Sequence, residues 1–229
     1  MKVKDVSLKR INNAYKITFK LINVTAFRIG ASEETLDPTT PDNSVMRSYK
    51  DGNLVPFIPG STLKGLFRAA VQSIDETYDK CGWHDKKASM ESKKEFIKLF
   101  EEPNNDINLC RTCKLFGNNF IEGRLFFTDS YAEGETKISI RDGVEIDRET
   151  ETAKDKAKYD YEVIEPGAVF PVEITAINVD EEDLKLIREV INLINLGIVR
   201  IGGSKSRGLG KFMVKDYKEE KIKGSDVNV

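Results

Sequence analysis

The apolar residues of this chain alternate between the two-residue period of a β-strand and the period of about 3.6 residues of an α-helix. Residues 15–27 alternate apolar and polar side chains, whereas residues 61–78 carry apolar side chains at helical spacing. The same patterns predict further strands at residues 123–132, 168–177 and 209–217 and a second helix at residues 180–195. The order β-α-β-β-α-β predicts an α+β protein with a ferredoxin-like, RRM-like core.

Long connections separate these predicted elements. With 229 residues, of which 39% are hydrophobic, the chain can bury one substantial core, so we expect a single elaborated domain over residues 1–229. Connections longer than about 12 residues are usually functional or disordered. We expect a core of residues 15–31, 58–79, 120–132 and 168–217, interrupted by a loop at 32–57, an insertion at 80–119 that contains all three cysteines, and a projecting β-hairpin, or thumb, at 133–167.

The charge balance limits which partners the surface can bind. A net charge of -2 and an isoelectric point near 5.7 argue against binding of polyanions over the whole surface. Two acid-free basic stretches, Leu54–Arg68 and Ile198–Lys211, could form local basic sites, although such windows also arise by chance. No apolar run approaches the roughly 20 residues of a membrane span, and the N-terminus lacks signal-peptide features. We expect a soluble, cytoplasmic protein with no membrane partner.

A glycine-rich basic segment lies near the end of the chain, at residues 202–211. Glycines let backbone N–H groups approach a phosphate closely, and basic side chains supply the charge. The spacing matches neither a Walker loop nor a clean dinucleotide-binding motif, which disfavours a nucleotide cofactor. The alternative is a glycine-rich turn before the last strand. The candidate phosphate contacts in this segment are Gly202, Gly203, Lys205, Arg207 and Lys211.

The start of the first predicted helix offers a second anion site. A Pro-Gly pair at residues 59–60 precedes the helix, and Ser61 or Thr62 is expected to be its N-cap. The free N–H groups and the positive end of the helix dipole attract anions, and Lys64 and Arg68 lie together on the solvated helix face. The alternative is an ordinary structural cap.

All three cysteines and the only histidine form two close-spaced pairs. Cys81 and His84 are separated by two residues, as are Cys110 and Cys113. This spacing is typical of a Cys3His zinc site, and four protein ligands leave no open position for catalysis. We therefore expect a structural Zn²⁺ that holds together a zinc-binding insertion at 80–119, which we expect to consist otherwise of polar residues. The alternatives are unrelated reduced cysteines or a Cys110–Cys113 disulfide.

Two blocks together resemble signatures of the RAMP superfamily of CRISPR-associated proteins: Ile58–Gly65, with the sequence IPGSTLKG, and residues 202–210, GGSKSRGLG. The segments between them are similar in order to those of the repeating backbone subunit of type III effector complexes. These segments are Leu115–Gly117, Gly123–Leu125, Ile146–Arg148 with Thr150, and Glu165–Phe170. The resemblance spans roughly residues 15–215.

The resemblance implies that the helix start and the glycine-rich loop hold phosphates of a guide RNA, while the thumb, with Ile146 and Arg148, pushes between bases. It also implies that a loop aspartate serves cleavage of the paired target RNA, which a divalent ion such as Mg²⁺ could assist. Asp42 is the matching candidate and Asp37 the second, although composition alone makes Asp42 an ordinary turn residue. Arg47, in the same segment, is a candidate RNA contact.

The implied partners are guide RNA, complementary target RNA, further copies of this chain and other effector-complex subunits. One alternative is a purely structural subunit of the same assembly. Another is a stand-alone RNA-processing endonuclease of the superfamily, which would normally need an acid/base pair. His84 is poorly placed for that role because it lies within the zinc pattern.

Overall fold

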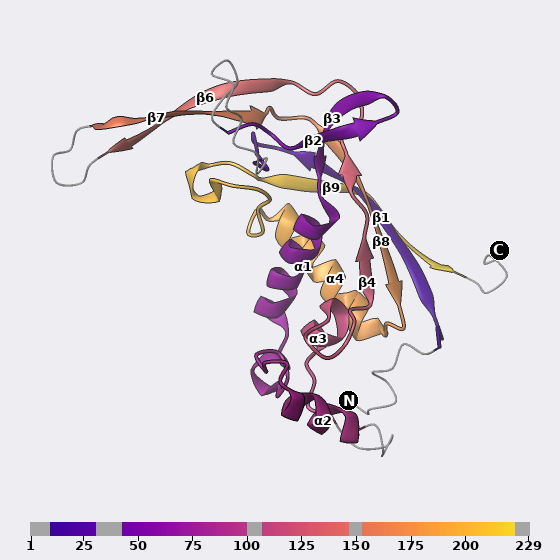
Figure 1. The fold of residues 1–229 in the computed structure, drawn as a ribbon. Helices are drawn as coiled ribbons and strands as arrows, with labels where there is room; N and C mark the ends of the chain where they lie inside the picture. The colour runs from indigo at the N-terminus through magenta and orange to yellow at the C-terminus, as the bar shows by residue number, and fades with distance from the viewer. Residues whose placement is uncertain (1–9, 31–42, 100–106, 147–152, 223–229) are drawn as a thin grey trace.

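The computed structural model describes residues 10–30, 43–99, 107–146 and 153–222, and it describes side chains in these ranges except at 144–158. Its central feature is an antiparallel sheet covered on one face by the helices α1 (Gly60–Ile74) and α4 (Glu181–Asn195) (Figure 1). The strand order is β4 (Leu125–Phe127), β8 (Val169–Ile177), β1 (Ala14–Asn23) and β9 (Phe212–Ile222). The predicted α+β class is confirmed.

The core forms where the predicted alternation places it. Along β8 every second side chain is buried, from Phe170 to Ala176, and β1 buries Ile17, Phe19 and Leu21 opposite them. An apolar stripe on α4 packs against this face of the sheet, because its buried residues recur every three or four positions. No helix in the described ranges has the length and hydropathy of a membrane span.

The prediction of one strand at 123–132 is wrong, because the segment forms two short strands in different sheets. The first is β4, and the second, β5 (Ser130–Tyr131), pairs with β3 (Asn53–Ile58). The Ser130 hydroxyl donates to the carbonyl of Pro171 at 2.6 Å, which holds the chain where it changes sheets. The predicted loop at 32–57 also contains regular structure, since β3 pairs with β2 (Arg47–Lys50).

The predicted hairpin at 133–167 is confirmed. Its strands β6 (Ile138–Ile146) and β7 (Ala153–Ile164) are antiparallel and project away from the central sheet (Figure 1). The base of this thumb is anchored in the core, because Phe27 and Ile164 exchange both backbone hydrogen bonds, at 3.0 and 2.8 Å. The buried Asn23 side-chain amide also donates to the carbonyls of Ile164 and Glu165.

The insertion at 80–119 has an apolar cluster of its own. It contains the helices α2 (Met90–Leu99) and α3 (Arg111–Phe116). The Trp83 ring lies edge-on to Phe96 and Phe120, with ring centroids 4.9 and 5.2 Å apart. We expected this insertion to consist of polar residues apart from its metal ligands. That expectation is wrong, since these apolar side chains form a buried cluster. The sequence did not reveal the cluster because its members lie far apart in the chain and meet only after folding.

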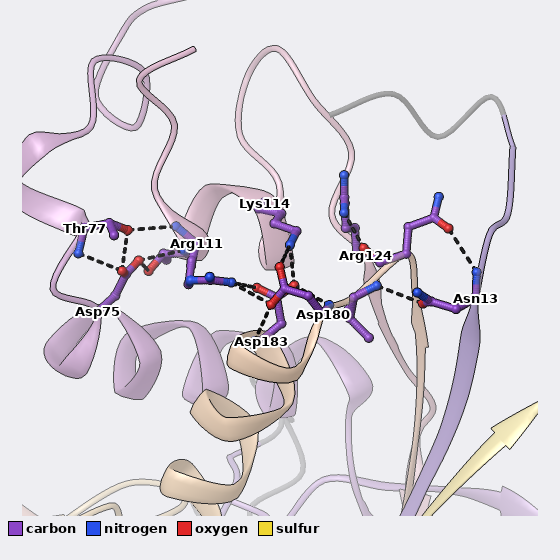
Figure 2. Close-up of polar contacts among 11 residues, drawn as sticks. Asn13, Asp75, Thr77, Arg111, Lys114, Arg124, Asp180 and Asp183 are labelled. Atoms are coloured by element: carbon purple, nitrogen blue, oxygen red, sulfur yellow. Dashed lines mark hydrogen bonds and ion pairs between the residues drawn. The ribbon is translucent and has the colours of Figure 1, made fainter. Parts of the chain in front are cut away.

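A buried ion-pair network joins α3 to the start of α4 (Figure 2). Asp180 and Asp183 form a capping box at the N-terminus of α4, and each carboxylate accepts hydrogen bonds from Arg111 at 2.8 Å. The Lys114 ammonium contacts both aspartates, and only 6% of the Lys114 side chain and none of Asp183 are exposed. Because a buried charge is costly without its partner, this network fixes the insertion to the core.

Asp180→Asn should destabilise the protein by about 1 kcal/mol at neutral pH. Asparagine can still cap α4, but it loses the charge-assisted hydrogen bonds that Arg111 and Lys114 donate to the half-exposed Asp180 carboxylate. Burial tends to raise the pKa of Asp180, but the hydrogen bonds from Lys114 and from the Asp183 N–H hold it below its usual value. Its stabilisation is therefore complete above the unfolded-state pKa of about 3.9 and is lost as pH falls through the lower folded-state pKa. Urea unfolding at pH 7, 5 and 3 should show the wild-type advantage shrinking only at pH 3; an advantage unchanged at pH 3 would contradict this assignment.

Candidate functional site

The N-terminus of α1 is seated on the segment between β4 and β5. The N-cap is Pro59, and the N–H of Gly60 donates to Asp129 at 2.7 Å. A Cβ at position 60 would lie 2.5 Å from the carbonyl oxygen of Phe127, so only glycine fits. The predicted N-cap at Ser61 or Thr62 is wrong, because a carboxylate distant in sequence takes the first amide of the helix.

A groove of about 380 Å³ lies between α1 and the glycine-rich loop. The loop lies beside the start of α1 and below the thumb (Figure 1). The two sequence blocks singled out as phosphate sites therefore line one surface. The residues around the groove are Ile29, Gly30, Thr62, Gly65, Leu66, Ala69, Gly202, Gly203 and Lys205.

Two glycines of the loop have structural reasons to be glycine. Gly202 has a φ of +89°, and a Cβ there would lie 2.2 Å from the carbonyl oxygen of Arg28. Gly210 has a φ of +79° and would approach the carbonyl oxygen of Ile201 equally closely. These positions fit the alternative of a structural turn, because their close backbone approach and positive φ leave no room for a side chain.

Gly65 and Gly203 have no such reason. A Cβ on Gly65 would meet nothing within 4 Å, and one on Gly203, which lacks a positive φ, would make an ordinary contact of 3.8 Å with Arg28. A glycine within a helix costs about 1 kcal/mol relative to alanine. Both glycines line the same groove, so their missing side chains leave space for a ligand to approach the protein backbone.

A second groove, of about 500 Å³, lies on the other side of α1. Lys64 and Arg68 line it together with His84, Asn118 and Phe126, whose side chain is half-exposed. Within the described ranges no ion pair is found for Lys64 or Arg68. Both side chains are partly exposed along this groove.

The basic residues of the glycine-rich loop differ in placement. Lys205 and Arg207 are exposed, and the Arg207 guanidinium donates to the Tyr159 hydroxyl of the thumb at 3.2 Å. The Lys211 side chain instead lies near Gly197, since a Cβ added to Gly197 would be 3.1 Å from the Cε of Lys211. Lys211 therefore lines neither groove.

Other predicted residues lie elsewhere or outside the described ranges. Arg47 forms an ion pair of 2.9 Å with Glu162 at the base of the thumb. Ile146 pairs with Ala153 in the hairpin. The remaining candidates, Asp37, Asp42 and Arg148, lie outside the described residues.

The predicted metal ligands lie together. The ligand atoms of Cys81, His84 and Cys110 are all within 4.8 Å of one another, and the Cys113 Sγ is 4.0 Å from the Cys81 Sγ. Cys110 is also the N-cap of α3, since its sulfur accepts the Cys113 N–H at 3.3 Å. All three cysteines are free thiols in the structure, without the Cys110–Cys113 disulfide.

The chemistry of this donor set fits a thiophilic cation. The Nδ1 of His84 is buried and has no hydrogen-bond partner in the described part of the chain, while its Nε2 lies 2.7 Å from Asp85. A carboxylate on one ring nitrogen commonly orients the other toward a metal. The hydrogen bond with Cys113, together with burial, raises the pKa of Cys110, and a bound cation would reverse this by favouring the thiolate.

A family model and two relatives of known name each match most of this chain. The family model of the RAMP superfamily matches residues 20–213. The chain is 28% identical over 224 residues to "CRISPR system Cms endoribonuclease Csm3" of Streptococcus thermophilus, covering 88% of this chain and 87% of that protein. It is 30% identical over 208 residues to the protein of the same name from Methanocaldococcus jannaschii, covering 85% of this chain and 75% of that protein.

A solved structure shares the fold. It is a chain of the "Cryo-EM structure of the Type III-B Cmr-beta bound to cognate target RNA", with a TM-score of 0.58 and 17% identity. The similarity covers 90% of this chain and 61% of that chain, so this chain spans less than two thirds of its length. Because the family model covers most of the residues and a relative is 30% identical over 85% of them, this chain belongs to the RAMP superfamily.

Proposed function

We propose that this protein is a guide-RNA-binding backbone subunit of a type III CRISPR effector complex and that it cleaves complementary target RNA at regular intervals. The observation that carries the RNA-binding part is the groove lined by both Gly65 and Gly203, two positions where the fold itself does not require glycine. Because neither glycine carries a side chain, a sugar-phosphate backbone has room to approach the protein closely at both positions. The endoribonuclease names of both curated relatives support the cleavage part.

The proposed phosphate contacts lie on both sides of α1. Thr62 and the loop residues Gly202, Gly203 and Lys205 would hold the backbone along the first groove. Ser61, which is exposed beside Thr62 at the start of α1, belongs to the same proposed set. Lys64 and Arg68 would meet phosphates along the second groove, and Arg207 would contact RNA beside the thumb. Lys211 and Arg47 belong to the proposed set with less support, because Lys211 lies near Gly197 and Arg47 is paired with Glu162.

Cleavage would use the 2′-hydroxyl of the target as nucleophile, with Asp42 taking its proton and Asp37 as the second candidate. As the 2′-oxygen bonds to the adjacent phosphorus, the bond to the 5′-oxygen would break, and that oxygen would take a proton from water, leaving a 2′,3′-cyclic phosphate and a 5′-hydroxyl. A divalent ion such as Mg²⁺, when bound, would stabilise charge on the scissile phosphate. Ile146 and Arg148 of the thumb would unstack bases and hold the backbone in an attack geometry. The spacing of adjacent copies of this chain along the guide would then set the interval between cuts.

The zinc site would be structural. Cys81, His84, Cys110 and Cys113 would hold one Zn²⁺ by four protein ligands, leaving no position for a substrate. We also propose that the central sheet with α1 and α4 is a ferredoxin-like core within one domain, residues 1–229. The order β4-β8-β1-β9 supports this, because it places the first and third core strands in the centre and the second and fourth at the edges.

Labelled complementary RNA, incubated with the assembled guide complex and a divalent ion, tests the proposal. Products spaced at a constant interval are expected, independent of the bases at the cut. A complex that binds this RNA without cutting it would instead identify a purely structural subunit.

Lys64→Ala and Arg207→Ala should each weaken binding of guide RNA and flatten its salt dependence. Each phosphate contact on a single strand contributes about -0.7 to the slope of log affinity against log salt concentration. Loss of one contact should therefore reduce the magnitude of the slope by about 0.7. Lys94→Ala is the matched control, because Lys94 is exposed on α2, outside both grooves. Wild-type slopes in both groove variants would mean that these blocks are only turns and caps.

A further inference from the structure

The segment Asn43–Arg47 is attached to the base of the thumb through one residue of β7. The N–H of Glu162 donates to the carbonyl of Asn43 at 3.0 Å. The Glu162 carboxylate accepts the N–H of Val45 at 2.8 Å and the guanidinium of Arg47, whose nitrogen lies 3.0 and 2.9 Å from the two oxygens. Backbone and side chain of Glu162 therefore hold three residues of this segment.

Arg28 connects the same junction to the glycine-rich loop. Its guanidinium donates to the Asn43 side chain at 3.2 Å and lies over the Tyr161 ring, 5.2 Å from the centroid. Its backbone carbonyl accepts the N–H of Gly203 at 2.9 Å. Through Arg28, the segment and the thumb therefore lie next to the glycine-rich loop.

The Arg47–Glu162 contact is strong enough to hold this arrangement. The Arg47 and Glu162 side chains are 25% and 13% exposed, so solvent screens their charges little. Charge-assisted hydrogen bonds are about twice as strong as neutral ones. Burial tends to raise the pKa of Glu162, but the bonds from Arg47 and Val45 hold it below its ordinary value, so the carboxylate is ionised at neutral pH.

We propose that Glu162 is a positioning residue for RNA cleavage, which locks the segment 43–47 to the thumb so that both act as one body. This inference rests on the proposed function, in which the thumb unstacks bases and Asp42, which directly precedes Asn43 in the sequence, serves the cut. With the two joined, the cut falls at a constant distance from the unstacked base. Misplacement of a reacting group by about 1 Å can cost about 100-fold in rate.

The test compares Glu162→Ala with Glu165→Ala in the assembled guide complex. Glu165 lies near the end of the same hairpin, but its carboxylate contacts Ser139 and Arg141, within the thumb. The single-turnover cleavage rate at saturating target RNA should fall about 10- to 100-fold in Glu162→Ala, with products spread over neighbouring linkages. Guide-RNA affinity should stay within about twofold, and Glu165→Ala should cut as the wild type does.

Glu162→Gln serves if the alanine variant does not fold. It keeps the shape and one acceptor oxygen but loses the charge that pairs with Arg47, so a smaller rate loss with the same spread of products is expected. A role in stability alone would lower the melting temperature without moving the cut sites. A wild-type rate and product pattern in either folded variant would overturn this inference while the proposed function stands. A wild-type complex that binds target RNA without cutting would overturn both.

Discussion

Asp42→Ala should abolish cleavage of paired target RNA while guide RNA remains bound. A nucleophile is already present in the 2′-hydroxyl of the target, so the protein need only hold the backbone and provide a carboxylate for proton transfer. Loss of a general base typically costs 100- to 10,000-fold in rate, about 3 to 5 kcal/mol in barrier height. Binding should persist, because the proposed phosphate contacts lie along α1 and the glycine-rich loop.

Single-turnover cleavage and guide affinity, measured on the same assembled complex, separate these effects. Asp42→Asn keeps the size of the side chain and removes its basicity, so it should be as inactive as the alanine variant. Asp37→Ala is the matched control in the same segment and should cut normally. Regularly spaced products from Asp42→Ala would transfer the role to Asp37 or another loop carboxylate.

Replacing both His84 and Cys110 should release the zinc and unfold the insertion at 80–119 before the sheet. In zinc-finger peptides, structural zinc contributes on the order of 10 kcal/mol to folding at neutral pH. The small apolar cluster around Trp83 is covered by chain that also carries the ligands, so it should lose its packing with the metal. Elemental analysis should find about one zinc per wild-type chain and none in the double variant.

Two further measurements sharpen this test. Hydrogen exchange should accelerate across 80–119 and stay slow in β1 and β8, because these strands are buried in the separate main core. Asp85→Ala should weaken zinc binding by about 10- to 100-fold without abolishing it, since Asp85 contacts only the outer nitrogen of His84. A wild-type protein without zinc, or zinc retained in the double variant, would refute the assignment.

Local patterns predicted the elements that have a clear inside and outside. The alternation in β1 and β8 and the stripe on α4 are visible in sequence, because each element buries one face against one core. The grouping of Cys81, His84 and Cys110 was also predictable, since metal sites use these residue types at such short spacing. Both blocks were recognised in the sequence, but no local pattern predicted that the start of α1 and the glycine-rich loop line one groove.

The errors arose where a distant residue completes a local structure. Asp129, rather than Ser61 or Thr62, occupies the first amide of α1, and the strand near 123–132 splits because Ser130 pairs with Ile58 in another sheet. The ion pair between Arg47 and Glu162 was not predicted either, because it depends on where the base of the thumb lies in the folded chain.

Sequence by itself therefore determined the α+β class, the order of the main elements, the Cys3His cluster and the two glycine-containing blocks, because backbone period, ligand chemistry and chain flexibility are properties of short segments. Only the tertiary structure decided which amides are capped, which cations are paired and which glycines face open space. Those properties depend on residues that are distant in sequence and near in space. Gly65 illustrates the division: its presence is a matter of sequence, but only the folded chain shows that the position of a Cβ on this residue is open space, with room for a ligand.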